Sequence, residues 1–109
     1  MADETVAADA TEQEQPSYRV LLVDDRPELR LLLRSRLQFE QDIEVVGEAS
    51  NGAEAVRLTK SLAPSAVVLD LEMPGMTGEE AIPLMRAAAP GMGILIYTAT
   101  PADRVALTE

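Results

Sequence analysis

The sequence predicts an α/β domain built on a doubly wound parallel sheet. Its 109 residues, of which 47% are hydrophobic, suit one small domain. From Tyr18 onward, short β-branched runs alternate with amphipathic segments, an order typical of parallel strands joined by right-handed crossovers. The strand segments are apolar along their length, which is the pattern expected where helices cover both faces of a sheet.

Four strands and four helices are predicted in alternating order. Short runs rich in Val, Leu and Ile predict the strands, which are YRVLLV at 18–23, DIEVVGEA at 42–49, SAVVLD at 65–70 and GILIYT at 93–98. Amphipathic segments predict the helices, which cover 27–37, 51–62, 77–89 and 101–109.

Local signals refine three of these helices. Pro27 suits the first turn of the first helix, and Asn51 is the predicted N-cap of the second. Pro83 falls inside the third, where it either kinks the helix or marks its true start. The first helix is predicted to have one apolar face made of Leu29, Leu32, Leu33 and Leu37, with Glu28, Arg30 and Arg34 turned away from it.

The first 17 residues differ from the rest of the chain. They contain five acidic residues, no basic residue and no sustained periodicity. This pattern predicts a disordered acidic leader at 1–17, followed by a domain at 18–109.

The composition excludes several classes of function. With 19 acidic and 9 basic residues and a formal net charge of -10, the chain is expected to repel nucleic acid and anionic membranes. It contains no Cys and no His, which excludes thiolate chemistry, Cys zinc sites and a histidine general base. No apolar run is long enough to span a bilayer. We therefore expect a soluble, cytoplasmic protein that binds neither nucleic acid nor membrane directly.

Polar side chains follow three of the predicted strands. Asp24 and Asp25 come after the first, Asp70 ends the third, and Thr98 ends the fourth. In the strand order 2-1-3-4 of the flavodoxin-like winding, strands one and three are neighbours, so the three carboxylates meet where the winding reverses. Each Asp taken alone is better explained as a strand end or a helix cap. The joint pattern indicates a functional site.

A cation is the natural companion of such a cluster. Three close carboxylates repel one another unless a cation offsets their charge. Mg²⁺ suits the site, because it takes a few carboxylates, keeps several waters and leaves room for a phosphoryl oxygen. Asp70 is then the candidate nucleophile that forms an aspartyl phosphate, and Thr98 is placed to hydrogen-bond a phosphoryl oxygen.

These segments resemble the receiver domain of bacterial two-component response regulators. The likeness is carried by VLLVDDRPELR, VVLDLEMPGMTGEEA and ILIYTAT, and more weakly by DIEVVGEASNGAEAV, which is similar to receivers that precede a helix-turn-helix output domain. It extends over residues 18–109. The resemblance implies a phosphorylation-controlled switch whose partner is a sensor histidine kinase or a phosphotransfer protein.

The same resemblance assigns a role to each candidate residue. It implies that Asp70 is both the phosphoacceptor and a ligand of the Mg²⁺ ion. It also implies that Asp24 and Asp25 form the acidic pair of the Mg²⁺ site, with Asp25 the more direct ligand of the pair. It adds the backbone carbonyl of Glu72 as a further ligand and makes Thr98 the switch hydroxyl.

The sequence departs from the family pattern at its C-terminal end. Receivers continue through the rest of a fourth helix, a fifth strand that ends in Lys, and a fifth helix, and we find none of these; Lys60, in the second helix, does not replace the missing cation. We therefore expect an incomplete domain, with 93–98 as an exposed apolar edge and the leucine face of the first helix poorly covered. Such an edge is expected to pair with a second copy or with a partner strand.

Other functions stay open at this point. The chain is alternatively a non-phosphorylated interaction module, or an inactive fragment of a longer regulator. An aspartyl-phosphate hydrolase is disfavoured, because Glu72 stands where such enzymes carry a second Asp and because the chain is too short for a substrate cap. We therefore expect that the chain is not an enzyme.

Overall fold

The computed structural model describes residues 18–97 and the backbone of residues 105–108. The leader predicted at 1–17 and the hydroxyl predicted at Thr98 lie outside the described residues. None of the described helices has the length and the apolar run that crossing a membrane takes.

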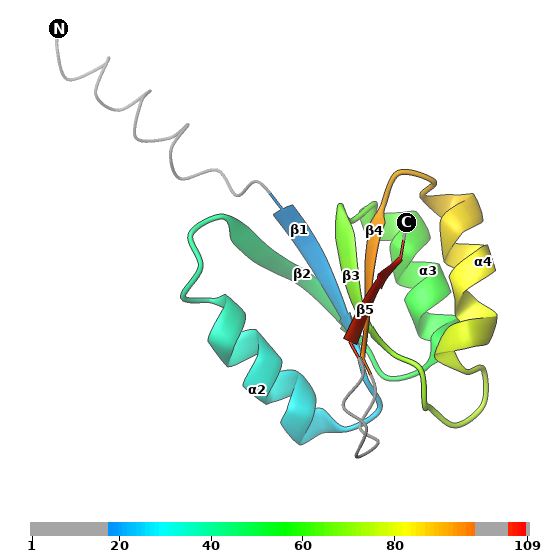
Figure 1. Ribbon diagram of the computed structural model, residues 1–109, viewed down its shortest axis with the longest axis horizontal. Helices are drawn as coiled ribbons and strands as arrows, with labels where there is room; N and C mark the ends of the chain where they lie inside the picture. The colour runs from blue at the N-terminus through cyan, green and yellow to red at the C-terminus, as the bar shows by residue number, and fades with distance from the viewer. Residues whose placement is uncertain (1–17, 98–104, 109) are drawn as a thin grey trace, which may run out of the picture.

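Five strands form one sheet in the order β2-β1-β3-β4-β5 (Figure 1). The first four are parallel, which confirms the predicted order 2-1-3-4. Their bounds are Tyr18–Val23 for β1, Ile43–Ala49 for β2, Ala66–Asp70 for β3 and Gly93–Tyr97 for β4. Val23 lies opposite Leu69, and Asp70 lies opposite Tyr97, so β1, β3 and β4 end at the same edge of the sheet.

The strand β5 (Val105–Thr108) corrects two expectations. A helix was expected from Pro101 onward, but residues 105–108 form a strand that pairs antiparallel with β4. The β4 edge, expected to be unpaired, is thereby covered along most of its length. The connection between β4 and β5, residues 98–104, is shorter than the dozen or more residues that a crossover between parallel strands needs. Antiparallel pairing of β5 with the open edge of β4 is therefore the arrangement that this length allows.

Three helices agree with the predicted segments. They are α2 (Pro27–Leu37), α3 (Gly52–Leu62) and α4 (Gly78–Ala88). The side chain of Asn51 caps α3 by accepting a hydrogen bond from the Glu54 backbone, as predicted. Thr77 and Glu80 form a reciprocal capping box at the start of α4. Pro83 lies inside α4 and does not mark its start.

The helices are divided unequally between the two faces of the sheet. Figure 1 shows α3 and α4 together on one face and α2 alone on the other. The main core lies beneath α3 and α4, where Ala55 of α3 and Met85 of α4 are fully buried. Alternate residues of the central strands complete it, namely Leu21, Val23, Val67, Leu69 and Ile94.

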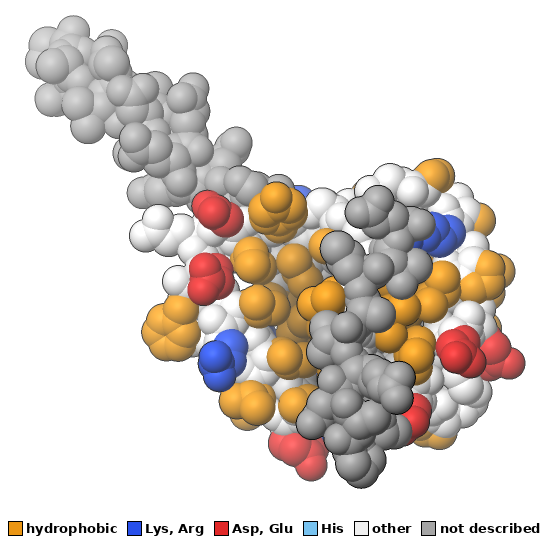
Figure 2. All heavy atoms as spheres, in the orientation of Figure 1, with side chains coloured by type: hydrophobic (Ala, Val, Ile, Leu, Met, Phe, Trp, Pro, Cys, Tyr) orange, Lys and Arg blue, Asp and Glu red, His pale blue; other side chains and the backbone are white. Residues whose placement is uncertain are grey.

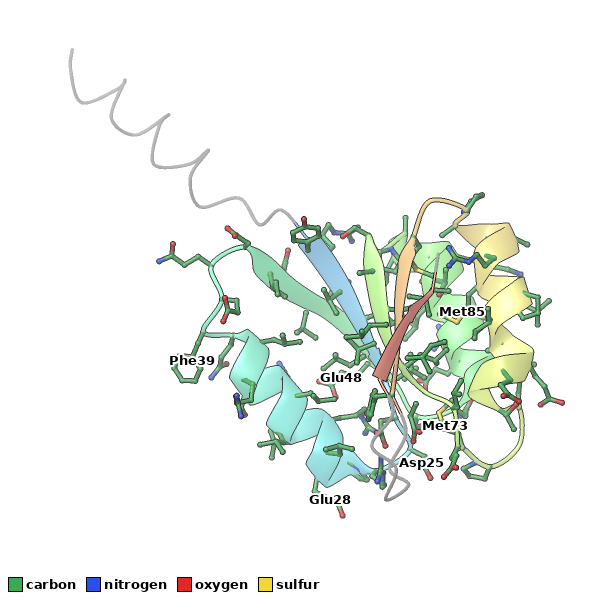
Figure 3. The ribbon with its side chains drawn as sticks, viewed as in Figure 1. Asp25, Glu28, Phe39, Glu48, Met73 and Met85 are labelled. Atoms are coloured by element: carbon green, nitrogen blue, oxygen red, sulfur yellow. The ribbon has the colours of Figure 1, made fainter. Side chains whose placement is uncertain are left out.

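The face that carries α2 is thinly covered, as expected. No residue of α2 is buried, and Leu32 of the predicted apolar face is 54% exposed. Figure 2 shows hydrophobic side chains gathered on this face, beside α2. Arg30 and Arg34, which we expected to turn away from the sheet, instead form ion pairs with Glu48 of β2. Figure 3 shows Glu48 between α2 and the sheet, with Phe39 at the outer end of the helix.

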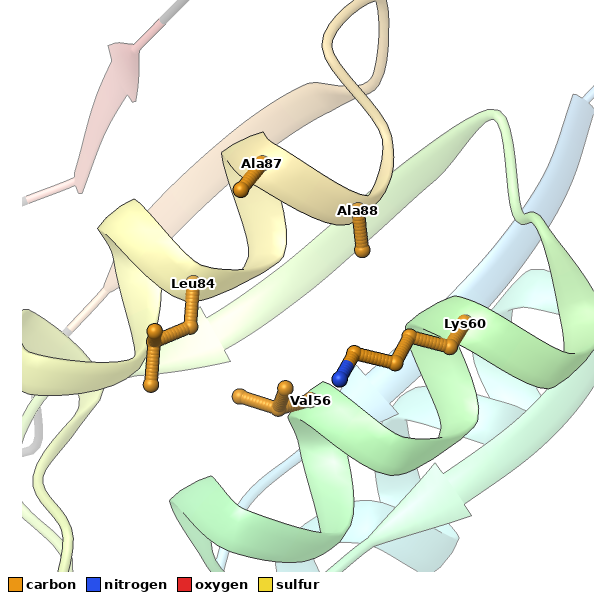
Figure 4. A pocket seen from close by; sticks show the side chains of 5 residues that line it. All are labelled: Val56, Lys60, Leu84, Ala87 and Ala88. Carbon is orange, nitrogen blue, oxygen red and sulfur yellow. The ribbon is translucent and has the colours of Figure 1, made fainter.

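A shallow groove separates α3 from α4 (Figure 4) and is lined by Val56, Lys60, Leu84, Ala87 and Ala88. Lys60 belongs to the last turn of α3. Because α3 starts at the edge where the parallel strands end, its last turn lies toward the opposite edge. Lys60 is therefore remote from the strand ends, as expected from the sequence.

Candidate functional site

Three carboxylates meet at the ends of β1 and β3, as predicted. Asp24 and Asp25 follow β1 directly, and Asp70 is the last residue of β3. One carboxylate oxygen of each lies within 4.8 Å of the others. Asp24 and Asp70 are buried, whereas Asp25 is half-buried and lies at the end of the sheet near the loop of Met73 (Figure 3). The pairing of β1 with β3 brings together side chains that are 45 positions apart in the chain, counted from Asp25 to Asp70.

The loop after Asp70 fixes the orientation of its carboxylate. The backbone N–H of Glu72 donates a hydrogen bond to Asp70 Oδ1 at 3.0 Å. The Leu71 carbonyl accepts a hydrogen bond from the Gly78 backbone at 3.1 Å, which ties the loop to the first turn of α4. The Glu72 side chain is exposed to solvent. The role of the Glu72 carbonyl as a metal ligand stays a prediction, and so does the role of Thr98.

Arg26 is a member of the site that sequence reasoning missed. Its Nε donates to Asp24 Oδ1 at 3.1 Å and its Nη2 donates to Asp24 Oδ2 at 3.0 Å. The same Nη2 lies 3.5 Å from Asp70 Oδ2. A signal was present in the sequence, because Arg26 directly follows the acidic pair. Arg26 therefore bridges two of the three carboxylates.

Tyr97 is a second member that sequence reasoning did not assign to the site. Its hydroxyl donates a hydrogen bond to Asp24 Oδ2. The signal was the strand register, since Tyr97 ends β4 directly opposite Asp70. Arg30 adds a hydrogen bond from its guanidinium to the backbone carbonyl of Asp24. Asp24 is thus held by the N-cap residue and the first turns of α2 and by the last residue of β4.

These contacts give the two buried carboxyls opposite pKa shifts. Burial alone would raise the pKa of Asp24, but hydrogen bonds from Arg26 and Tyr97 outweigh it and lower that pKa. Burial raises the pKa of Asp70, and the charges of Asp24 and Asp25 add to this effect against the opposing Glu72 hydrogen bond. The pKa of Tyr97 is raised, first by burial and then by its hydrogen bond to Asp24, so its phenol stays protonated.

The donor set fits a hard divalent cation. Every candidate ligand atom is an oxygen, and three carboxylates offer the few anionic ligands that Mg²⁺ prefers. One guanidinium faces three carboxyl groups, so a divalent ion would offset the negative charge that the cluster carries when these groups ionise. Burial is the main cause of the raised pKa of Asp70, and the neighbouring charges of Asp24 and Asp25 add to it.

The site is thus an acidic cluster at the ends of two neighbouring parallel strands of a doubly wound α/β domain. The sequence matches the family model of the response regulator receiver domain over residues 20–108. The chain therefore belongs to the response regulator receiver domain family.

Known proteins of this family share both sequence and fold with the chain. The nitrate/nitrite response regulator NarL of Escherichia coli K12 is 39% identical over 84 residues, which cover 77% of this chain and 39% of NarL. The response regulator domain of Thermotoga maritima CheB superposes with a TM-score of 0.71 at 34% identity, covering 74% of this chain and 60% of that one. The signal receiver domain of Mycobacterium tuberculosis NarL gives a TM-score of 0.71 at 34% identity, covering 80% and 72%. The matched part of this chain thus spans about two fifths of the length of NarL of Escherichia coli.

Proposed function

We propose that this chain is the phosphoacceptor domain of a two-component response regulator, with Asp70 receiving a phosphoryl group in a Mg²⁺-dependent reaction. The observation that carries the proposal is the cluster of Asp24, Asp25 and Asp70 at the ends of two neighbouring parallel strands, in a chain of the receiver family. The phosphoryl donor is a sensor histidine kinase or a phosphotransfer protein, acting in the cytoplasm. Phosphorylation then changes which partners the domain binds.

The surroundings of Asp70 support its role as the nucleophile. Asp70 Oδ1 is fixed by the Glu72 N–H, and Asp70 Oδ2 faces Arg26. In the proposed step an Asp70 oxygen attacks phosphorus. A new P–O bond forms while the bond from phosphorus to the donor breaks, and the donor leaves with that bonding pair. Asp24 and Asp25, with the carbonyl of Glu72, would hold Mg²⁺, which supplies positive charge for the phosphoryl oxygens.

The proposed switch hydroxyl is Thr98. It directly follows Tyr97, whose hydroxyl already contacts Asp24 in the acidic cluster. A hydrogen bond from Thr98 to a phosphoryl oxygen on Asp70 would connect the chemistry of the cluster to the segment that follows β4. Support for this role comes from the family resemblance and from the position of Tyr97 beside the site.

The test is labelling of the full chain by a small phosphodonor such as acetyl phosphate. We expect the intact mass to rise by one phosphoryl group in the presence of Mg²⁺, and we expect no rise when a chelator removes the metal. Asp70→Asn should abolish labelling, because the amide is a poor nucleophile. Asp42→Asn is the matched control, because Asp42 is exposed and precedes β2 at the opposite edge of the sheet.

Labelling that survives Asp70→Asn would refute the assignment of the phosphoacceptor. Failure of the wild-type chain to label, with Mg²⁺ and phosphodonor in excess, would favour the alternative of a non-phosphorylated interaction module.

A further inference from the structure

Arg26 occupies an unusual place for a cation. It is the N-cap residue of α2, and its side chain makes no capping hydrogen bond. Positive charge at a helix N-terminus is ordinarily unfavourable. The guanidinium is held there by carboxylates instead, with two hydrogen bonds to Asp24 and a 3.5 Å contact to Asp70. Its position therefore depends on the acidic cluster.

The guanidinium and a metal ion would use the same oxygen atoms. Asp24 Oδ1 accepts hydrogen bonds from both the backbone N–H and the Nε of Arg26. Asp24 Oδ2 accepts from Arg26 Nη2 and from the Tyr97 hydroxyl. Both oxygens of Asp24 are thus already engaged, and an ion bound to either of them must replace at least one of these donors.

Arg26 has a route out of the site, whereas the neighbouring arginine is tied to the sheet. The Arg26 side chain is 35% exposed, and among the described residues its ion-pair partners are Asp24 and Asp70 only. Arg30 is less exposed, at 18%, and it holds both Glu48 and the Asp24 carbonyl. Arg26 can therefore turn toward solvent while Arg30 keeps α2 in place.

We propose that Arg26 is an internal counter-ion that occupies the metal-binding oxygens of Asp24 in the metal-free domain, so that Mg²⁺ binds only as the guanidinium leaves. This proposal rests on the proposed function, because both require Mg²⁺ at the acidic cluster. Two consequences follow. The empty cluster is stabilised against its own charge repulsion, and the affinity for Mg²⁺ is lower than three carboxylates alone would give.

The displacement can be followed in the wild-type chain by NMR of the arginine Nε–H groups during a Mg²⁺ titration. We expect the Arg26 Nε–H signal to shift and to exchange faster with water as Mg²⁺ saturates, because its hydrogen bond to Asp24 Oδ1 is lost. The Arg30 Nε–H donates to Glu48 and should stay nearly unchanged. An Arg26 signal that does not move at saturating Mg²⁺ would overturn the proposal without touching the proposed function.

Calorimetric titration of variants with Mg²⁺ gives a second measurement. Arg26→Gln removes the competing charge, and we expect it to tighten Mg²⁺ binding about ten-fold, the factor that corresponds to losing one charge-assisted hydrogen bond. Arg36→Gln is the matched control, because it removes the same charge from an exposed position at the far end of α2, and it should bind like wild type.

The outcomes separate the two proposals. Equal affinities in the wild type, Arg26→Gln and Arg36→Gln would exclude Arg26 as a competitor while leaving the metal site intact. Weaker binding by Arg26→Gln would also contradict the inference, since it would make Arg26 a support of the metal site. No saturable binding by any of the three chains would remove the Mg²⁺ site, and the proposed function would fail with it.

Discussion

Replacing Gly78 with alanine is expected to lower the stability of the domain and to disturb the acidic cluster, because Gly78 packs against the backbone of Asp70, the proposed phosphoacceptor. A Cβ atom at position 78 would lie 2.6 Å from the Asp70 carbonyl oxygen and 2.8 Å from the Leu71 Cα. Both neighbours are backbone atoms, so the start of α4 or the end of β3 must move by several tenths of an ångström. The hydrogen bond from Gly78 to the Leu71 carbonyl would be strained by the same movement.

The expected loss of stability combines two opposing terms. Overpacking of this kind costs about 1–3 kcal/mol. Exchange of glycine for alanine recovers about 0.4–1 kcal/mol, because the unfolded chain loses freedom. A net destabilisation of about 1–2 kcal/mol should lower the melting temperature by roughly 5–15 °C in a domain of this size. Because Asp70 is displaced as well, the rate of labelling by acetyl phosphate should also fall.

Thermal melting followed by circular dichroism measures this effect, with Gly91→Ala as the control. Gly91 is exposed in the turn before β4, and a Cβ there meets no atom within 4 Å. Gly91→Ala should melt within a degree or two of wild type and should be labelled normally. If Gly78→Ala melted alongside Gly91→Ala, the close approach of α4 to Asp70 would be refuted.

Two further predictions concern the core and the acidic cluster. Met85→Ala should lower the free energy of unfolding, measured in urea, by about 2–5 kcal/mol, because the Met85 side chain is fully buried in the core. Leu84→Ala, on the exposed side of the same helix, should lower it by only about 0.5 kcal/mol. Equal losses in the two variants would contradict this packing. In metal-free solution at neutral pH, Asp24→Asn should lower the free energy of unfolding by about 1 kcal/mol. This is less than a fully buried ion pair would give, because the partner Arg26 is partly exposed to solvent. Folding lowers the pKa of Asp24 below its ordinary value of 3.8. The ionised carboxylate therefore stabilises the folded domain fully at pH values above 3.8, and this contribution is lost as the pH falls through the lower pKa of the folded state. Urea melts at neutral and acidic pH should show the gap between wild type and variant closing, and a gap that widens in acid would disprove this account.

Much of the architecture followed from residue patterns. The apolar runs around Leu21 and Leu69 predicted buried parallel strands, because only a sheet covered on both faces accommodates such runs. The N-cap signal at Asn51 predicted where α3 begins. Parallel pairing then placed Asp24, Asp25 and Asp70 together, since strands that run in one direction end at one edge.

The features that the sequence did not predict depend on geometry beyond local pattern. The segment VALT at 105–108 was assigned to a helix, and its strand conformation comes from the open edge of β4, a tertiary influence that propensity does not contain. Arg30 and Arg34 form ion pairs with Glu48, a partner on β2 that the helical pattern of α2 does not identify. The membership of Arg26 in the site required the backbone geometry of the turn between β1 and α2.

The thin cover of the α2 face means that the domain is unequal in local stability. Protection of α3 and α4 against amide hydrogen exchange rests on a buried core, whereas α2 has no buried residue and is anchored to the sheet partly by ion pairs of Arg30 and Arg34 with Glu48. The helix α2 should therefore open in excursions that leave β1 and β3 folded, with its amides exchanging faster than theirs. Because α2 begins at the acidic cluster, each opening should also loosen Arg26, which adds a second route to the turning of that side chain by which ions reach the cluster.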